Sequence, residues 1–197
     1  MKYIHDIGEY FLMLKKVFGR MTKTSVLRGL IFKEIDDLII SSLGIVIFIS
    51  FFIGGVVTIQ TALNLTNPLI PKSLIAFTAR QSIILEFSPT FISIIMAGKV
   101  GSNITSSIGT MRVMEQIDAL EVMGINSANY LIFPKIIAML LYPFVIAISM
   151  FVGIAGAYAA GVLGGFVAGE EFLNGLQNDF IPFHLVYAFI KTFFFAL

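Results

Sequence analysis

Long apolar runs separated by short polar stretches dominate the pattern along the chain. Three runs exceed the roughly 20 residues that a helix needs to cross a bilayer, and they lie at about 38–63, 73–98 and 130–167. A fourth apolar run, 183–197, is too short for a full span and has no polar anchor after it. The pattern predicts an all-α protein, a polytopic membrane helix bundle, and we expect its natural chain to continue past residue 197.

The N-terminal 34 residues have a different pattern. A set of apolar residues recurs there at helical spacing between charged positions: Ile7, Phe11, Leu14, Phe18 and Met21. This amphipathic pattern predicts an interfacial helix over 1–34, lying in the membrane surface. A soluble helix packed on a partner protein would give the same pattern.

Composition supports a membrane protein and excludes some chemistry. The chain has 197 residues, of which 13% are charged, against about 25% in soluble domains. It has no cysteine, so disulfides, thiolate nucleophiles and cysteine metal sites are excluded. The net charge of +1 gives no indication of nucleic acid as a partner. We therefore expect a single membrane domain over 1–197.

The distribution of basic residues predicts the topology. Residues 1–33 contain seven of the thirteen lysines and arginines, and the segment 99–135 contains three. The segment 168–182 contains none, but it has three acidic residues. The positive-inside rule then places the N-terminus and residues 99–135 in the cytoplasm.

A stripe of small residues marks the third apolar run. Four of them fall four positions apart on one predicted helix face: Gly153, Ala157, Gly161 and Gly165. Small side chains let two helices approach closely in a membrane. The face fits ordinary packing within the chain, and it also fits a mobile or dimer-forming interface.

Glu86 lies midway along the second apolar run, three residues before Pro89. An ionisable group at this depth is costly, so it normally faces a bundle interior or cavity and has a partner. Arg80 is too far round the helix to pair comfortably, and Pro89 is expected to kink the span near Glu86. Glu86 therefore marks a lipid path or gating contact, or a structural polar bond to another helix.

A short acidic segment separates the second and third runs. We predict a helix over 110–124, with Val113, Ile117 and Leu120 on one face and three carboxylates on another. It is too short and too charged to cross a bilayer. It fits a solvated connector, and it also fits a docking helix for a soluble cytoplasmic partner, because an apolar ridge and charges set such contacts.

The sequence contains no recognisable catalytic or nucleotide site. The stretch "AGKVGS" (97–102) lacks the earlier glycine and the Ser or Thr of a phosphate loop. His5 and His184 are far apart in sequence, and no Ser–His–acid set can be assembled. We expect no enzyme activity and no bound cofactor, so any ATP would be used by a partner subunit.

The segment "AGKVGSNITSSIGTMRVMEQIDALEVMGI" (97–125) closely resembles the signature of the MlaE family of ABC-transporter permeases, and "LEFSPT" (85–90) extends the match. The chain departs from the family where Leu85 and Ser107 replace frequent Arg and Glu residues. The resemblance implies a permease homodimer with a cytoplasmic ABC ATPase and an MCE-domain substrate-binding protein. It also implies that an ATPase-contacting coupling helix contains Glu115, Gln116, Ile117, Asp118, Ala119, Leu120 and Glu121.

These observations predict the permease subunit of an ABC transporter that moves phospholipid or a related lipid between membranes. The resemblance implies a multi-pass protein of the bacterial inner membrane. A self-sufficient secondary transporter or channel would require paired broken helices or several intramembrane charges. A membrane-embedded lipid-modifying enzyme would require clustered catalytic side chains, which the sequence lacks.

Overall fold

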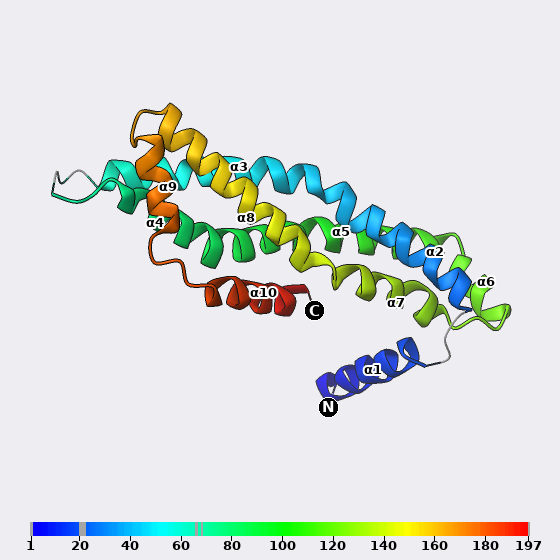
Figure 1. Cartoon of the computed structure of the whole chain (residues 1–197). Helices are drawn as coiled ribbons and strands as arrows, with labels where there is room; N and C mark the ends of the chain where they lie inside the picture. The colour runs from blue at the N-terminus through cyan, green and yellow to red at the C-terminus, as the bar shows by residue number, and fades with distance from the viewer. Residues whose placement is uncertain (1, 20–22, 66, 68, 197) are drawn as a thin grey trace. The chain divides into compact units, whose positions relative to one another are not determined.

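The computed structural model describes residues 2–19, 23–65, 67 and 69–196. These residues form helices joined by short turns, and they include no strand, which confirms the all-α prediction. The elements in chain order (Figure 1) are α1 (Lys2–Val17), α2 (Thr24–Glu34), η1 (Ile35–Ile40), α3 (Ser41–Asn64), α4 (Ser73–Ser82), η2 (Ile83–Phe91), α5 (Ile92–Val113), α6 (Gln116–Val122), α7 (Ser127–Met139), α8 (Tyr142–Tyr158), η3 (Ala159–Leu163), α9 (Gly169–Gln177) and α10 (Phe183–Ala196).

Within the described part of the chain, three helices are long and apolar enough to cross a membrane, which confirms the predicted class of membrane helix bundle. They are Thr24–Asn64, Ser73–Val113 and Ser127–Leu163. The first two contain the predicted runs 38–63 and 73–98, whereas the third ends four residues before the predicted boundary at 167. The shorter apolar helix α10 covers most of the fourth run.

Residues 1–34 do not form the single interfacial helix that the sequence predicted. Helix α1 ends at Val17, and α2 begins at Thr24 and continues into the first long helix. Gly19 lies just after α1, and glycine has a low helix propensity. Lys15 and Lys16 in the last turn of α1 also favour this end, because cations stabilise a helix C-terminus. Arg20 and Met21 lie outside the described residues.

Each of the three long helices contains one π-helical segment, in which the hydrogen bonds span one residue more than in an α-helix. These segments are η1, η2 and η3. Segment η2 contains Glu86 and Pro89. The unusual backbone of the second span is therefore located at the predicted polar site.

Contacts within the chain group it into two compact units, and the first consists of residues 1–41 and 98–141. In this unit α2 packs against α7, and α1 contacts α7 at its C-terminal end. Lys135 of α7 donates to both carboxylate oxygens of Glu34 in α2, at 2.7 Å each. The Lys135 side chain is 8% exposed, so removing either partner would leave a buried unpaired charge.

The second unit consists of residues 42–97 and 142–197. Helix α9 packs against α4, and α8 and α10 pack against η2 (Figure 1). Gly175 permits the first contact, because a Cβ atom there would lie 2.1 Å from the Ser73 carbonyl oxygen. The buried core between these elements contains Ile75, Ala76, Ile83, Ala157, Val167 and Phe172. The single permease domain predicted for 1–197 stays a prediction.

Candidate functional site

Helix α6 is bounded on both sides by residues with left-handed backbone. Glu115 precedes it with φ of 57°, and Gly124 follows it with φ of 74°. At the C-terminal end, the Gly124 N–H donates to the Glu121 carbonyl at 2.9 Å, and the Ile125 N–H donates to the Leu120 carbonyl at 3.0 Å. This pair of bonds is a Schellman motif, which satisfies the final helix carbonyls and fixes the direction of the exit.

The predicted helix over 110–124 is therefore wrong in its boundaries. Helix α5 continues to Val113, and α6 runs only from Gln116 to Val122. The left-handed Glu115 breaks the helix because L-residues cannot continue a right-handed helix through that conformation. Val113 consequently does not share a helix face with Ile117 and Leu120, which are half-buried.

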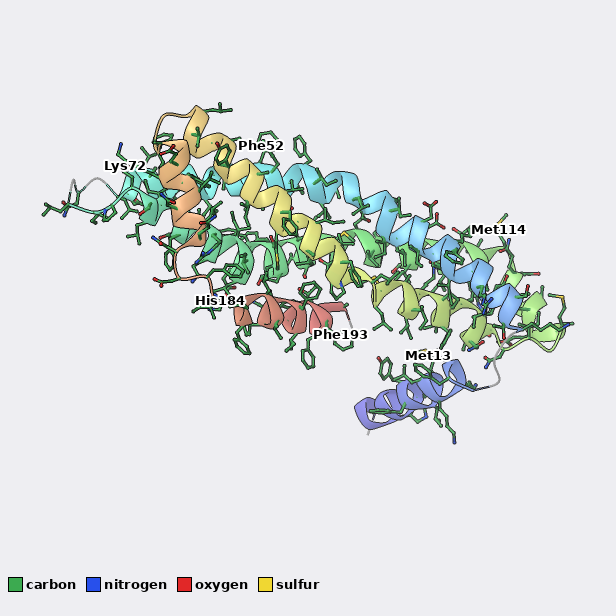
Figure 2. All side chains as sticks on the ribbon, in the orientation of Figure 1. Met13, Phe52, Lys72, Met114, His184 and Phe193 are labelled. Carbon is green, nitrogen blue, oxygen red and sulfur yellow. The ribbon has the colours of Figure 1, made fainter. Side chains whose placement is uncertain are left out.

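Exposed apolar and acidic side chains surround α6 and form what we call the α6 patch. Its apolar members are 65–89% exposed, and Met114 points outward in Figure 2. The patch comprises Val113, Met114, Val122 and Met123 together with Glu115, Asp118 and Glu121. An exposed apolar group rimmed by charges is typical of a protein interaction surface. Arg112 and Asp118 form an ion pair at 2.7 Å beside it.

Glu86 has a partner that the sequence analysis missed. The ammonium of Lys191 in α10 donates to a Glu86 carboxylate oxygen at 2.8 Å and to the Leu85 carbonyl at 3.1 Å. The Lys191 side chain is 19% exposed and that of Glu86 is 62% exposed. One side of the carboxylate thus stays open while the ammonium is covered. A lone lysine in the apolar C-terminal run was the signal that could have identified this partner.

At Pro89, where the sequence predicted a kink, the helix continues without a break as the π-helical segment η2. Pro89 lies inside η2, which continues into α5. The Pro89 carbonyl accepts a hydrogen bond from the Ser93 hydroxyl at 2.5 Å, and that hydroxyl also accepts one from Tyr142 at 3.2 Å. These bonds satisfy buried polar groups next to the proline.

Arg80 is a second charged group that the sequence analysis did not assign. It is 3% exposed, and its guanidinium donates to the carbonyls of Leu176, Asn178 and Asp179. The guanidinium also lies 5.0 Å from the ring centre of Phe77 and 5.5 Å from that of Phe180. Arg80 therefore holds the C-terminal end of α9 and the turn after it, using three of the five donors of its planar guanidinium.

The four small residues predicted to share one face are not equivalent. A Cβ atom on Gly153 would lie 3.0 Å from Ile83, and one on Gly161 would lie 3.0 Å from Phe172. Ala157 belongs to the buried core. Gly165 is exposed, with φ of 73°, in the turn that ends the third long helix. It leaves the face because η3 shifts the helical register and the helix stops at Leu163.

Among the described residues, no group of three or more His, Asp or Glu side chains is arranged to hold a metal ion. The structure presents two candidate sites. One is the exposed α6 patch, and the other is the ion pair of Glu86 and Lys191, whose ammonium is covered. Such groups can bind a partner or a polar headgroup by charge and hydrogen bonding.

Comparison with known proteins matches residues 31–197 to the family described as Permease MlaE. A probable ABC transporter permease protein of Rickettsia bellii is 34% identical over 152 residues, covering 74% of this chain and 58% of the relative. A probable ABC transporter permease protein of Synechocystis is 30% identical over 169 residues, covering 85% and 64%. The chloroplastic protein trigalactosyldiacylglycerol 1 of Arabidopsis thaliana is 33% identical over 155 residues, covering 77% and 43%.

The chain spans about three fifths of the length of the bacterial relatives that it matches, at 58–64%. The match includes α6, η2 and α10, because all three lie within residues 31–197. Helix α1 precedes the matched range.

Proposed function

Since this chain belongs to the MlaE family of permeases, we propose that it is the membrane-spanning subunit of an ABC transporter that moves phospholipid or a related lipid between membranes. A separate cytoplasmic ATPase drives the movement, and the chain itself performs no covalent chemistry. The name of the Arabidopsis relative refers to a galactolipid, which supports a lipid as the cargo.

The observation that carries the proposal is the α6 patch in a chain of this family. Helix α6 is held between two left-handed residues, so its exposed side chains have a defined direction. The patch combines apolar side chains that a groove can bury with three carboxylates that can orient a basic partner surface. We propose that the ATPase docks on this patch, and that the segment Glu115–Glu121 acts as the coupling helix.

The ion pair of Glu86 and Lys191 is the second part of the proposal. The pair joins the second long helix to the shorter apolar helix α10, and its carboxylate side is open. A zwitterionic headgroup offers one cation and one anion, so it can exchange partners with this pair. We propose that the pair, next to Pro89 in η2, lies on the lipid path or gates it.

The same proposal gives the location and the other partners. The basic N-terminal segment supports a cytoplasmic N-terminus in a bacterial inner membrane. A second copy of the chain and an MCE-domain protein on the opposite side complete the complex. Family membership supports both partners.

The test reverses two charges of the patch, with Glu115→Lys and Asp118→Lys combined. Docking of the ATPase should weaken, because like charges across an interface can cost several kcal/mol. The measurement is the amount of ATPase that co-purifies with the chain from membranes, beside lipid transport. Val122→Asp provides an independent variant, since this side chain is 89% exposed and its replacement leaves the packing of the chain intact.

The matched control is the double variant Glu170→Lys with Glu171→Lys in the first turn of α9, which changes the net charge equally. This control should retain the ATPase. Equal retention of the ATPase by all variants, at equal membrane levels, would refute docking at the α6 patch. Loss of ATPase from the control as well would show that net charge, and not the patch, governs binding.

A further inference from the structure

The C-terminal end of α1 is held by two asparagine side chains of the first compact unit. The amide nitrogen of Asn126 donates to the Lys16 carbonyl at 2.7 Å, and that of Asn129 donates to the Val17 carbonyl at 2.6 Å. Val17 is fully buried, and the Phe18 ring meets the Phe133 ring edge-on at 5.9 Å. The last carbonyls of a helix lack the regular partner four residues on. The Lys16 carbonyl accepts the Gly19 N–H at 3.2 Å, to which Asn126 adds a second bond, and Asn129 supplies a donor for the Val17 carbonyl.

The same two asparagines belong to the element that follows the coupling helix directly. Asn126 is the N-cap of α7, and its side-chain oxygen accepts the Asn129 N–H at 3.3 Å. The Ser127 hydroxyl donates to the Glu121 carboxylate at 2.9 Å, which ties the first residue of α7 to α6. The end of α1, the end of α6 and the start of α7 are therefore bound to one another within a few residues.

Away from this end, α1 stands apart from the other elements of the unit. A cleft of about 750 Å³ separates its residues Glu9, Leu12, Met13 and Lys16 from Glu121 and residues 125–128. Its large apolar side chains Tyr10, Phe11 and Leu12 are 56–65% exposed. An amphipathic helix with such a face binds to a membrane surface. Helix α1 is thus held to the unit at its C-terminal end.

We infer that Asn126 and Asn129 are positioning residues that make α1 follow the coupling helix. We call these two side chains and the carbonyls of Lys16 and Val17 the α1 joint. When the ATPase moves α6, the joint transmits the movement to α1, which then tilts in the membrane surface. The inference rests on the proposed docking of an ATPase at the α6 patch, and it adds a second moving element to that function.

Asn126→Asp separates the two roles of Asn126. Aspartate keeps the oxygen that caps α7, and it lacks the amide that binds the Lys16 carbonyl. The variant therefore opens half of the joint without removing the cap. Asn129→Asp opens the other half in the same way, since the bond to Val17 also needs an amide donor. Asn126→Ala, which loses both functions, is the comparison for loss of the cap.

The first measurement reports on the joint itself. The chain has no cysteine, so Met13→Cys and Ala128→Cys place a unique pair across the cleft. A bifunctional thiol reagent then measures how often α1 is docked in native membranes. We expect Asn126→Asp to lower the cross-linking yield about two- to tenfold, which corresponds to the loss of one hydrogen bond. An unchanged yield would refute the joint, whether or not an ATPase docks on α6.

The second measurement reports on transmission. The complex that carries Asn126→Asp should retain its ATPase and its membrane level, while lipid transported per ATP hydrolysed falls. If the joint is purely structural, the variant should lower the amount of the chain in the membrane and leave lipid transported per ATP unchanged. That result would refute the inference. Loss of the ATPase from the complex would also refute it. If the charge reversal of α6 leaves docking intact, the proposed function fails, and the cross-linking result still decides whether the joint exists.

Discussion

Replacing Gly54 with alanine tests the closest contact between two long helices in the second compact unit. A Cβ atom on Gly54 in α3 would lie 1.9 Å from the carbonyl oxygen of Gly153 in α8. The two backbones must move apart by about 1 Å before this separation reaches 3.0 Å, below which Cβ atoms are not found. The hydrogen bond between Ser50 and Ser149, at 2.8 Å between the same helices, would lengthen with them.

The expected loss in the free energy of unfolding is the cost of overpacking, which is about 1–3 kcal/mol for added methyl groups. We expect the upper end of this range, because the obstructing atoms are backbone and cannot rotate away. An alanine also gains about 1 kcal/mol of helix propensity over glycine. Gly44→Ala in the same helix includes this gain without the clash, since no atom lies within 4 Å of its Cβ position. The Gly54 variant should therefore be about 3 kcal/mol less stable than the Gly44 variant.

The free energy of unfolding can be measured in detergent micelles by titration with a denaturing detergent, with helicity followed by circular dichroism. Gly55→Ala is a second control, because its Cβ would meet Ala160 at an ordinary 3.4 Å. It should resemble the Gly44 variant. Equal stability of the Gly54 and Gly44 variants would refute the close packing of α3 on α8 at Gly54 and Gly153.

Two further predictions concern the ion pair and the topology. Glu86→Gln and Lys191→Gln should each lower lipid transport, and the exchanged pair Glu86→Lys with Lys191→Glu should restore part of it, as a transport assay in vesicles would measure; full transport by both single variants would exclude the pair from the lipid path. A cysteine at Thr110 should react with an impermeant thiol reagent from the cytoplasmic side, and one at Asn174 from the opposite side; the reverse labelling pattern would invert the topology.

The spans were predictable because their signal is local and long. About 20 apolar residues in sequence have few alternatives to crossing a bilayer, so the three long helices could be located without a structure. Their extensions into the polar segments were not predictable in this way, since α2 and the end of α5 carry charges. The break after Val17 also follows from packing against α7, which no local pattern encodes.

The candidate site was predictable only in part. The family string located residues 115–121, but the left-handed backbone of Glu115 has no signature in a non-glycine side chain. The partner of Glu86 is 105 positions away, and pairing at that separation depends on tertiary structure. Gly165 fits the spacing of small residues and yet lies in a turn, because η3 changes the register before it.

Segment η2 also determines how the second long helix responds to changes in chain length. One extra residue is accommodated in a π-helical segment, so deleting a residue within Ile83–Phe91 converts it to regular α-helix. The residues directly after η2 would then keep their helical register, so Ser93 would stay opposite Tyr142. The same deletion in the regular helix of α4 would instead turn the residues after it by about 100°. A one-residue gap within η2 should therefore be tolerated far better than one within α4.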